Sequence, residues 1–317
     1  MIDKERFKRF LELYLYRLNN GVPAGTRPVT AEEYRETHRG MPEKKEKRFI
    51  NLVLFVITLC TTTFAGSVPG NTIYDTMVSG LPYSLSLMAI LGVHEFGHYF
   101  AARSFGVKTT LPFFIPFPSI VGTMGAVIKT RSPIPHNRAL YYIGIMGPLP
   151  GFVISVAAVV IGVKLSHIQP VPVDASDEFV PLFGNSMLFG SIIYFLKGSI
   201  PDGFYLLLHP AAWAGWIGFL ITSLNLIPIG QLDGGHILYS LVGRKQVYAG
   251  WISLAALVVL TFIWPGWGVW IVLTLLILMV AHPRIPETEL LSLKEKAAGW
   301  FAMAVLVLTF IPVPVQI

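Results

Sequence analysis

The stretch LPYSLSLMAILGVHEFGHYFAARSFG (residues 81–106) decides the fold, because it is an apolar run of membrane-spanning length that contains the motif HEFGH. On a helix, residues four apart share a face, so His94 and His98 can offer two imidazole nitrogens to one metal ion. Glu95 lies about 100° round the helix, where it would activate a water molecule instead of binding the metal. Two ligands and a general base are the pattern of a zinc hydrolase.

The same spacing also fits a helix with two buried, hydrogen-bonded histidines that bind nothing. The surroundings argue against this alternative. Ionisable side chains inside a membrane span are costly, and they are mostly found where they have a function. We therefore favour the metal site.

The composition is that of a polytopic membrane protein. Hydrophobic residues make up 53% of the 317 residues and charged residues only 13%, about half the charged fraction of a soluble globular protein. In lipid the backbone must satisfy its own hydrogen bonds, so we expect an all-α fold. The single Cys60 excludes an internal disulfide and a cysteine-based zinc site.

The apolar segments predict six transmembrane helices. These are residues 49–66, 82–103, 139–163, 205–229, 246–264 and 266–281. Residues 298–313 are a short seventh candidate with prolines at its end. Residues 186–196 are too short to cross the membrane.

Two domains are expected, a polar N-terminal extension at residues 1–48 and one transmembrane domain at residues 49–317. The extension contains the amphipathic run FKRFLELYLYRL, with apolar side chains at helical spacing. Such a helix can lie on the membrane surface, bind a partner, or pack on the protein itself.

Lysine and arginine set the expected orientation. Of the 24 such residues, 22 fall in the N-terminal extension and in alternate loops, which the positive-inside rule places in the cytoplasm. These residues act as anchors to the membrane, so the net charge of +6 does not call for a nucleic-acid partner. We expect a multi-pass protein of a bacterial or archaeal plasma membrane, with a cytoplasmic N-terminus.

A catalytic zinc takes three protein ligands, and Asp233 is the expected third. Of the acidic residues that follow Glu95, the others lie in polar loops or at span ends far from an apolar site. Asp233 lies in NLIPIGQLDGG (residues 225–235), at the predicted cytoplasmic end of the fourth span and at the depth of His98. His209 and His236 are left out of the ligand set.

The residues around Asp233 predict a break in the helix. Pro228 and Gly230 interrupt it, and Gly234 and Gly235 permit a turn that aims the carboxylate inward. The alternative is that Asp233 is the N-cap of the helix that follows, a position for which aspartate is well suited.

These two motifs together resemble the site-2 protease family of intramembrane zinc metalloproteases, over about residues 82–245. The resemblance implies that His94, His98 and Asp233 hold Zn²⁺ and that Glu95 activates water. It also implies that Asn225 helps to orient the substrate or to stabilise the oxyanion.

The implied activity is hydrolysis of peptide bonds in transmembrane segments of single-pass proteins, near the cytoplasmic face. The family is also expected to have a third span interrupted by Gly and Pro, here IGIMGPLPG (residues 143–151). We expect a compact member. The outer loop at about 165–204 is too short for an inserted PDZ domain, and no soluble C-terminal tail provides a nucleotide-sensing module.

Between the second and third predicted spans, prolines exclude a stable helix. They predict a short strand-like, membrane-associated segment near residues 111–130. An exposed edge there could accept an extended substrate segment by strand addition. An ordinary interfacial loop is the alternative.

Two other functions compete with the protease. A membrane transporter or metal-handling protein could use the same ligands, but it predicts polar residues along several spans, whereas here they concentrate at one depth. A prenyl-protein-type membrane protease would require a glutamate ligand in a later span, and the later spans contain none.

Overall fold

The structure is a computed structural model that describes residues 48–316, apart from residues 69, 71, 172–181 and 280–288. The predicted N-terminal domain and its amphipathic helix therefore lie outside the described residues, apart from Arg48, which begins the first described helix.

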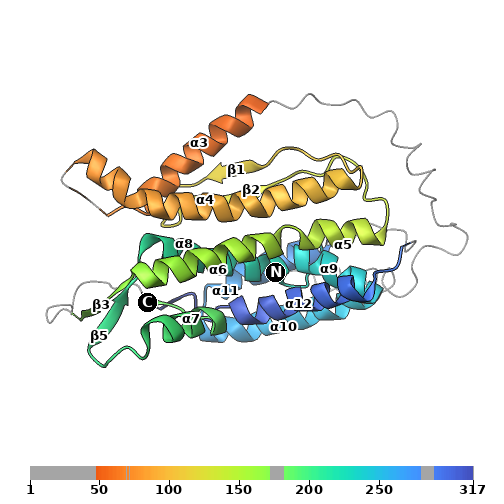
Figure 1. The fold of residues 1–317 in the computed structure, drawn as a ribbon. Coiled ribbons are helices and arrows are strands. Elements are labelled where there is room, and N and C mark those ends of the chain that lie inside the picture. The colour runs from red at the N-terminus through yellow and green to blue at the C-terminus, as the bar shows by residue number, and fades with distance from the viewer. Residues whose placement is uncertain (1–47, 69, 71, 172–181, 280–288, 317) are drawn as a thin grey trace, which may run out of the picture. The chain divides into compact units, whose positions relative to one another are not determined.

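Four helical stretches in the described part of the chain are long and apolar enough to cross a membrane. They are α3 (Arg48–Ala65), α4 (Ile73–Ser104), α5 with α6 (Asn137–Ile145 and Pro148–Leu165), and α9 with α10 (Asp233–Val242 and Gln246–Ile263). The turn η1 (Gly243–Lys245) joins the last two. The expected class, a mostly helical polytopic membrane protein, agrees with this architecture (Figure 1).

The remaining described helices are shorter. They are α7 (Met187–Lys197), α8 (Pro210–Leu226), α11 (Trp267–Met279) and α12 (Leu293–Thr309). Helix α7 matches the apolar segment that we judged too short to span. Helix α12 begins five residues before the predicted seventh candidate, residues 298–313, because Ser292 and Glu295 form a capping box ahead of the apolar run.

Two predicted span boundaries were wrong. Helix α4 begins nine residues before position 82, because Thr72 and Asp75 form a capping box and Pro82 is accommodated inside the helix. Helix α8 is shorter than the predicted span at residues 205–229. Strand β5 (Phe204–Leu207) occupies the start of that run, and His209 caps the helix just before its first residue.

The segment near residues 111–130 forms a hairpin. Strand β1 (Phe113–Pro116) pairs antiparallel with β2 (Thr123–Val127). The strand-like segment was predicted for this proline-rich stretch, whereas the pairing of two strands was not. Figure 1 shows the hairpin beside α4, and both α3 and α4 contact it. Two further two-stranded sheets join β3 (His167–Pro170) to β5 and β4 (Leu182–Phe183) to β6 (Val315–Gln316).

Side chains from α3 and α4 fasten this hairpin. The Asn51 amide donates to the carbonyls of Leu111 and Pro112 at 3.1 and 3.0 Å. The hydroxyl of Tyr83, a fully buried side chain, donates to the Val121 carbonyl at 2.8 Å. These bonds satisfy carbonyl groups of non-helical backbone that lies against membrane helices. They hold the hairpin on α3 and α4.

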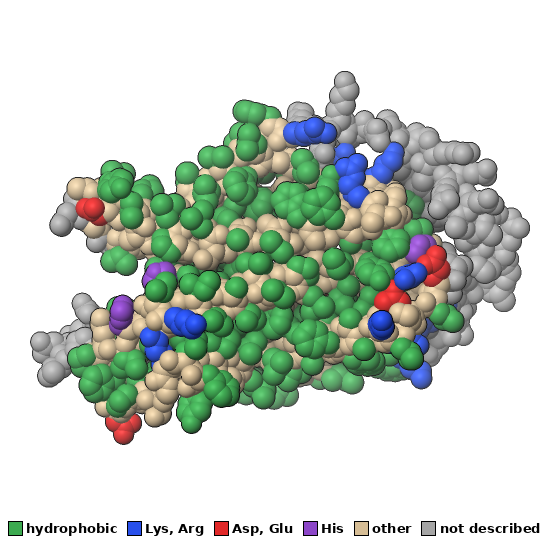
Figure 2. Space-filling view, in the orientation of Figure 1, with side chains coloured by type: hydrophobic (Ala, Val, Ile, Leu, Met, Phe, Trp, Pro, Cys, Tyr) green, Lys and Arg blue, Asp and Glu red, His purple; other side chains and the backbone are tan. Residues whose placement is uncertain are grey.

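Helices α4, α6 and α8 pack closely on one another and support the site. A Cβ atom on Gly162 would lie 2.1 Å from the backbone nitrogen of Ala212, and one on Gly218 would lie 2.2 Å from Ser155 Oγ. Small residues let membrane helices approach this closely, because association in lipid depends on packing. Hydrophobic side chains also cover the middle of the visible face in Figure 2, while charged side chains gather towards its ends.

Candidate functional site

Two distant helices meet at a cluster of three metal-binding side chains. Helix α4 contributes His94 and His98, and α9 contributes Asp233. The Asp233 Oδ2 atom lies 3.4 Å from His94 Nε2 and 3.3 Å from His98 Nε2, and the two imidazole nitrogens are 3.0 Å apart. Among the described residues, this group alone could hold a metal ion with three such ligands.

The spacing fits a zinc ion. Ligand atoms bound to zinc at about 2.0–2.2 Å in a tetrahedral arrangement lie about 3.3–3.5 Å apart. Both histidine–aspartate distances reach this value, and the histidine pair is a few tenths of an ångström shorter. Two imidazoles and one carboxylate leave a fourth position for water or substrate, which is the arrangement of a catalytic centre.

A backbone carbonyl orients one of the imidazoles. Nδ1 of His98 lies 2.6 Å from the carbonyl oxygen of Ile143 in α5. Because this nitrogen donates its proton to the carbonyl, Nε2 is left as the lone-pair nitrogen that faces Asp233. No sequence pattern predicts this contact, since any residue type at position 143 supplies the same carbonyl.

Glycines at the start of α6 make room for both imidazoles. A Cβ atom on Gly147 would lie 2.1 Å from His98 Nε2, and one on Gly151 would lie 3.3 Å from His94 Nδ1. A Cβ atom on Gly97 of α4 would lie 1.8 Å from the carbonyl oxygen of Met146. The Gly/Pro-interrupted stretch therefore forms the surface on which the two histidines pack.

Asp233 is the first residue of α9, and Leu232 occupies the N-cap position with no side-chain cap. The N-cap alternative for Asp233 is therefore not what the structure shows. The carboxylate is instead directed at the two histidines.

The expected role of the two glycines after Asp233 was wrong. Gly234 and Gly235 are helical, and neither has a positive φ. Their small size is what matters, because a Cβ atom on Gly234 would lie 1.9 Å from the carbonyl oxygen of Leu226. The left-handed conformation falls at Gly230, whose φ is +47°.

The other two predicted residues also lie at the cluster. The Asn225 amide, near the end of α8, is 3.4 Å from His94 Nε2. Glu95 is buried beside His94, and the backbone of Ile128, the residue after β2, lies near its carboxylate. The end of the hairpin therefore lies close to the predicted general base.

Comparison with known proteins agrees with this geometry. Residues 82–264, more than half of the chain, match peptidase family M50. The chain belongs to peptidase family M50. This confirms the resemblance to site-2 proteases that the two motifs suggested.

The relatives of this M50 chain include plant proteins. A probable zinc metalloprotease of Arabidopsis thaliana, EGY2, chloroplastic, is 37% identical over 174 residues, which cover 54% of this chain and 30% of the relative. The probable zinc metalloprotease EGY1, chloroplastic, of Oryza sativa subsp. japonica is 30% identical over 243 residues, or 74% of this chain and 40% of the relative. The chain thus spans less than half the length of these curated relatives.

The two histidines left out of the ligand set are also outside the cluster in this M50 chain. His209 caps α8, and its Nδ1 accepts a hydrogen bond from the backbone N–H of Ala211 at 3.2 Å. His236 lies in α9, where its Cβ packs against Gly144.

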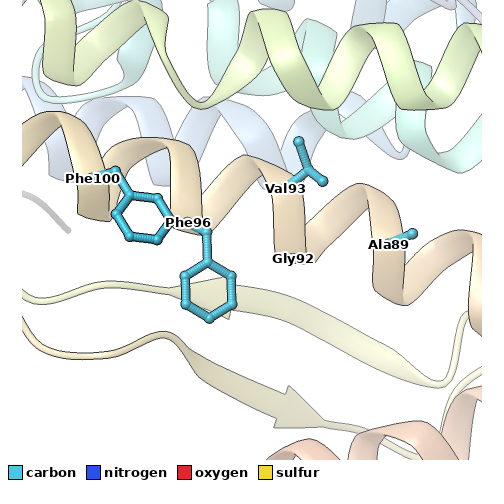
Figure 3. A pocket seen from close by; sticks show the side chains of 5 residues that line it. All are labelled: Ala89, Gly92, Val93, Phe96 and Phe100. Carbon is cyan, nitrogen blue, oxygen red and sulfur yellow. The ribbon is translucent and has the colours of Figure 1, made fainter.

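An apolar groove of about 470 Å³ runs along α4 (Figure 3). Its lining residues are Ala89, Gly92, Val93, Phe96 and Phe100. Phe96 is two residues from each metal-binding histidine and hence roughly 200° round the helix from both. The groove therefore lies on the side of α4 that faces away from the M50 site.

Proposed function

We propose that this M50 chain is an intramembrane zinc endopeptidase that hydrolyses peptide bonds of transmembrane segments near the cytoplasmic face. One observation carries the proposal. Two imidazoles and a carboxylate from separate helices meet at the spacing of zinc ligands, inside a helical protein whose spans are apolar.

His94, His98 and Asp233 would hold the metal. When bound there, zinc acts as a Lewis acid on the scissile carbonyl and makes water more acidic. Glu95 takes the proton of the attacking water and passes it to the leaving amine. The Asn225 amide, 3.4 Å from His94 Nε2, donates a hydrogen bond to the oxyanion.

The hairpin provides the surface for an extended substrate. A helical peptide bond is shielded, so the substrate segment must unwind before hydrolysis. Strand β2 pairs with β1 along one edge, and the backbone of Ile128, just after its end, lies near the Glu95 carboxylate. A substrate strand added to the other edge of β2 would therefore run past the general base.

The substrates in this proposal are single-pass membrane proteins. The chain crosses a bacterial or archaeal plasma membrane six times, with α12 as the seventh candidate span and the N-terminus in the cytoplasm. The distribution of 22 of 24 Lys and Arg residues supports this orientation. The concentration of ionisable residues at one depth speaks against a transport path.

Reconstitution tests this function. Purified protein in liposomes should cleave a single-span membrane peptide, and Glu95→Gln should abolish cleavage without loss of metal, because the base is not a ligand. Asp202→Asn, which makes the same change at an exposed carboxylate, should cleave at the wild-type rate. Zinc uptake into the liposomes without cleavage would replace the protease with the transporter alternative.

A further inference from the structure

The ligand loop, residues 227–232, joins α8 to α9 between Asn225 and Asp233. Its backbone is not helical, although it lies at the end of a membrane helix. Backbone groups in such a place need hydrogen-bond partners, because lipid provides none. The position of the Asp233 carboxylate depends on how this loop is held.

Some backbone groups of the loop form hydrogen bonds with one another. The N–H of Ile229 donates to the carbonyl of Ile227 at 2.7 Å, and the N–H of Leu232 donates to the carbonyl of Ile229 at 3.0 Å. The carbonyl of Pro228 lies between these two turns. In the part of the chain that the structure describes, no backbone N–H donates to it.

A side chain from another helix donates a hydrogen bond to this carbonyl. Gln246, the first residue of α10, is 3% exposed, and its Nε2 donates to the Pro228 carbonyl at 2.8 Å. We propose that Gln246 is a positioning residue, which holds the ligand loop so that Asp233 stays within reach of His94 and His98. This proposal rests on the proposed function, in that the positioned carboxylate is a zinc ligand.

The chemistry of the contact requires a hydrogen-bond donor at position 246. An amide donates to a carbonyl, a leucine of similar size does not, and a carboxylate does so only while protonated. Arg244 and Lys245, both exposed, lie in η1 just before Gln246. They favour the ionised form of a carboxylate introduced at position 246.

Two substitutions test the proposal, with zinc affinity measured by chelator competition beside kcat and KM. Gln246→Leu should weaken zinc binding about ten- to a hundredfold, the usual effect of losing a partner that orients a metal ligand. The value of kcat should fall more than KM changes, because the substrate surface on the hairpin is untouched. The matched control, Gln169→Leu on exposed β3, should leave both unchanged.

Gln246→Glu tests the hydrogen bond itself. The ratio of its activity to wild type at the same pH should fall as the pH rises and the introduced carboxylate ionises, and zinc affinity should follow. This comparison uses one folded variant at several pH values, so it still decides if Gln246→Leu fails to fold. Wild-type zinc affinity in folded Gln246→Leu, wild-type zinc affinity in Gln246→Glu at every pH, or a ratio that does not depend on pH would overturn the proposal.

The two proposals fail separately. If wild type cleaves no membrane peptide but Gln246→Leu still loses zinc affinity, the positioning role stands and the protease function falls. If wild type cleaves and both variants match it, only the role of Gln246 falls.

Discussion

At the scale of single residues, some atoms of the site can be predicted from the sequence and others cannot. The helical repeat places His94 and His98 on one face of a helix. Elimination among the acidic residues identified Asp233 as the expected third ligand. The carbonyl of Ile143 and the amide of Gln246 could not be foreseen. The first is a main-chain atom, and the second reaches the ligand loop from a different helix.

Asp233→Asn tests whether the Asp233 carboxylate is a zinc ligand. An amide is a poor zinc ligand, so we expect zinc affinity and hydrolysis to fall strongly in this variant, as measured by metal titration and peptide cleavage. Near-wild-type affinity and activity would contradict a ligand role for Asp233 and move the search for a third ligand to His236.

Gly147→Ala tests the packing of the histidines. The added methyl group would lie 2.1 Å from His98 Nε2, so the imidazole must move and zinc affinity should fall at least tenfold. The control is Gly92→Ala on the same pair of packed helices. A Cβ atom there meets nothing within 4 Å, so zinc affinity should stay at the wild-type value while the helix gains up to about 1 kcal/mol in stability. Equal zinc affinity in both variants would contradict the packing account.

At the scale of elements, apolar runs predicted which segments are helical better than where they begin. The start of α4 was missed because its first two turns mix polar and apolar residues and precede a proline. The start of α8 was missed because β5 is as apolar as the helix that follows. The prolines predicted a strand-like segment, whereas its pairing into a hairpin and its closeness to Glu95 depend on tertiary structure.

Helix α12 lies outside the residues matched to the M50 family and yet contacts α8 and α9. Its first turn is tied to α5, which carries Ile143. The Arg138 guanidinium donates to the nearly buried Glu295 carboxylate at 2.7 Å, and the Tyr141 hydroxyl donates to the Glu295 carbonyl at 2.5 Å.

Glu295→Gln should therefore lower the unfolding temperature, with a loss on the order of 1 kcal/mol for a charge-assisted bond. Arg138→Gln should also lower the unfolding temperature, and the double variant should lose less than the sum of the two single losses. Thermal unfolding in detergent measures this. Strict additivity of the two losses would show that the pair does not interact in the membrane protein.

At the scale of the whole molecule, the basic residues predict the direction from which water reaches the site. With Cys60 replaced by serine, single cysteines at Lys108 and Ser132 should react only with reagent on the cytoplasmic side. A cysteine at Asp202 should react only from outside. The reverse pattern would invert the orientation and the side on which cleaved segments are released.

The central claim is that two distant helices form one catalytic zinc centre. Its most direct test is the metal content of purified protein, measured by mass spectrometry on wild type, the double variant His94→Ala/His98→Ala, and Glu95→Gln. The account predicts about one zinc per chain in wild type and in Glu95→Gln, which is inactive, and none in the double variant. Full zinc retention in the double variant would contradict it.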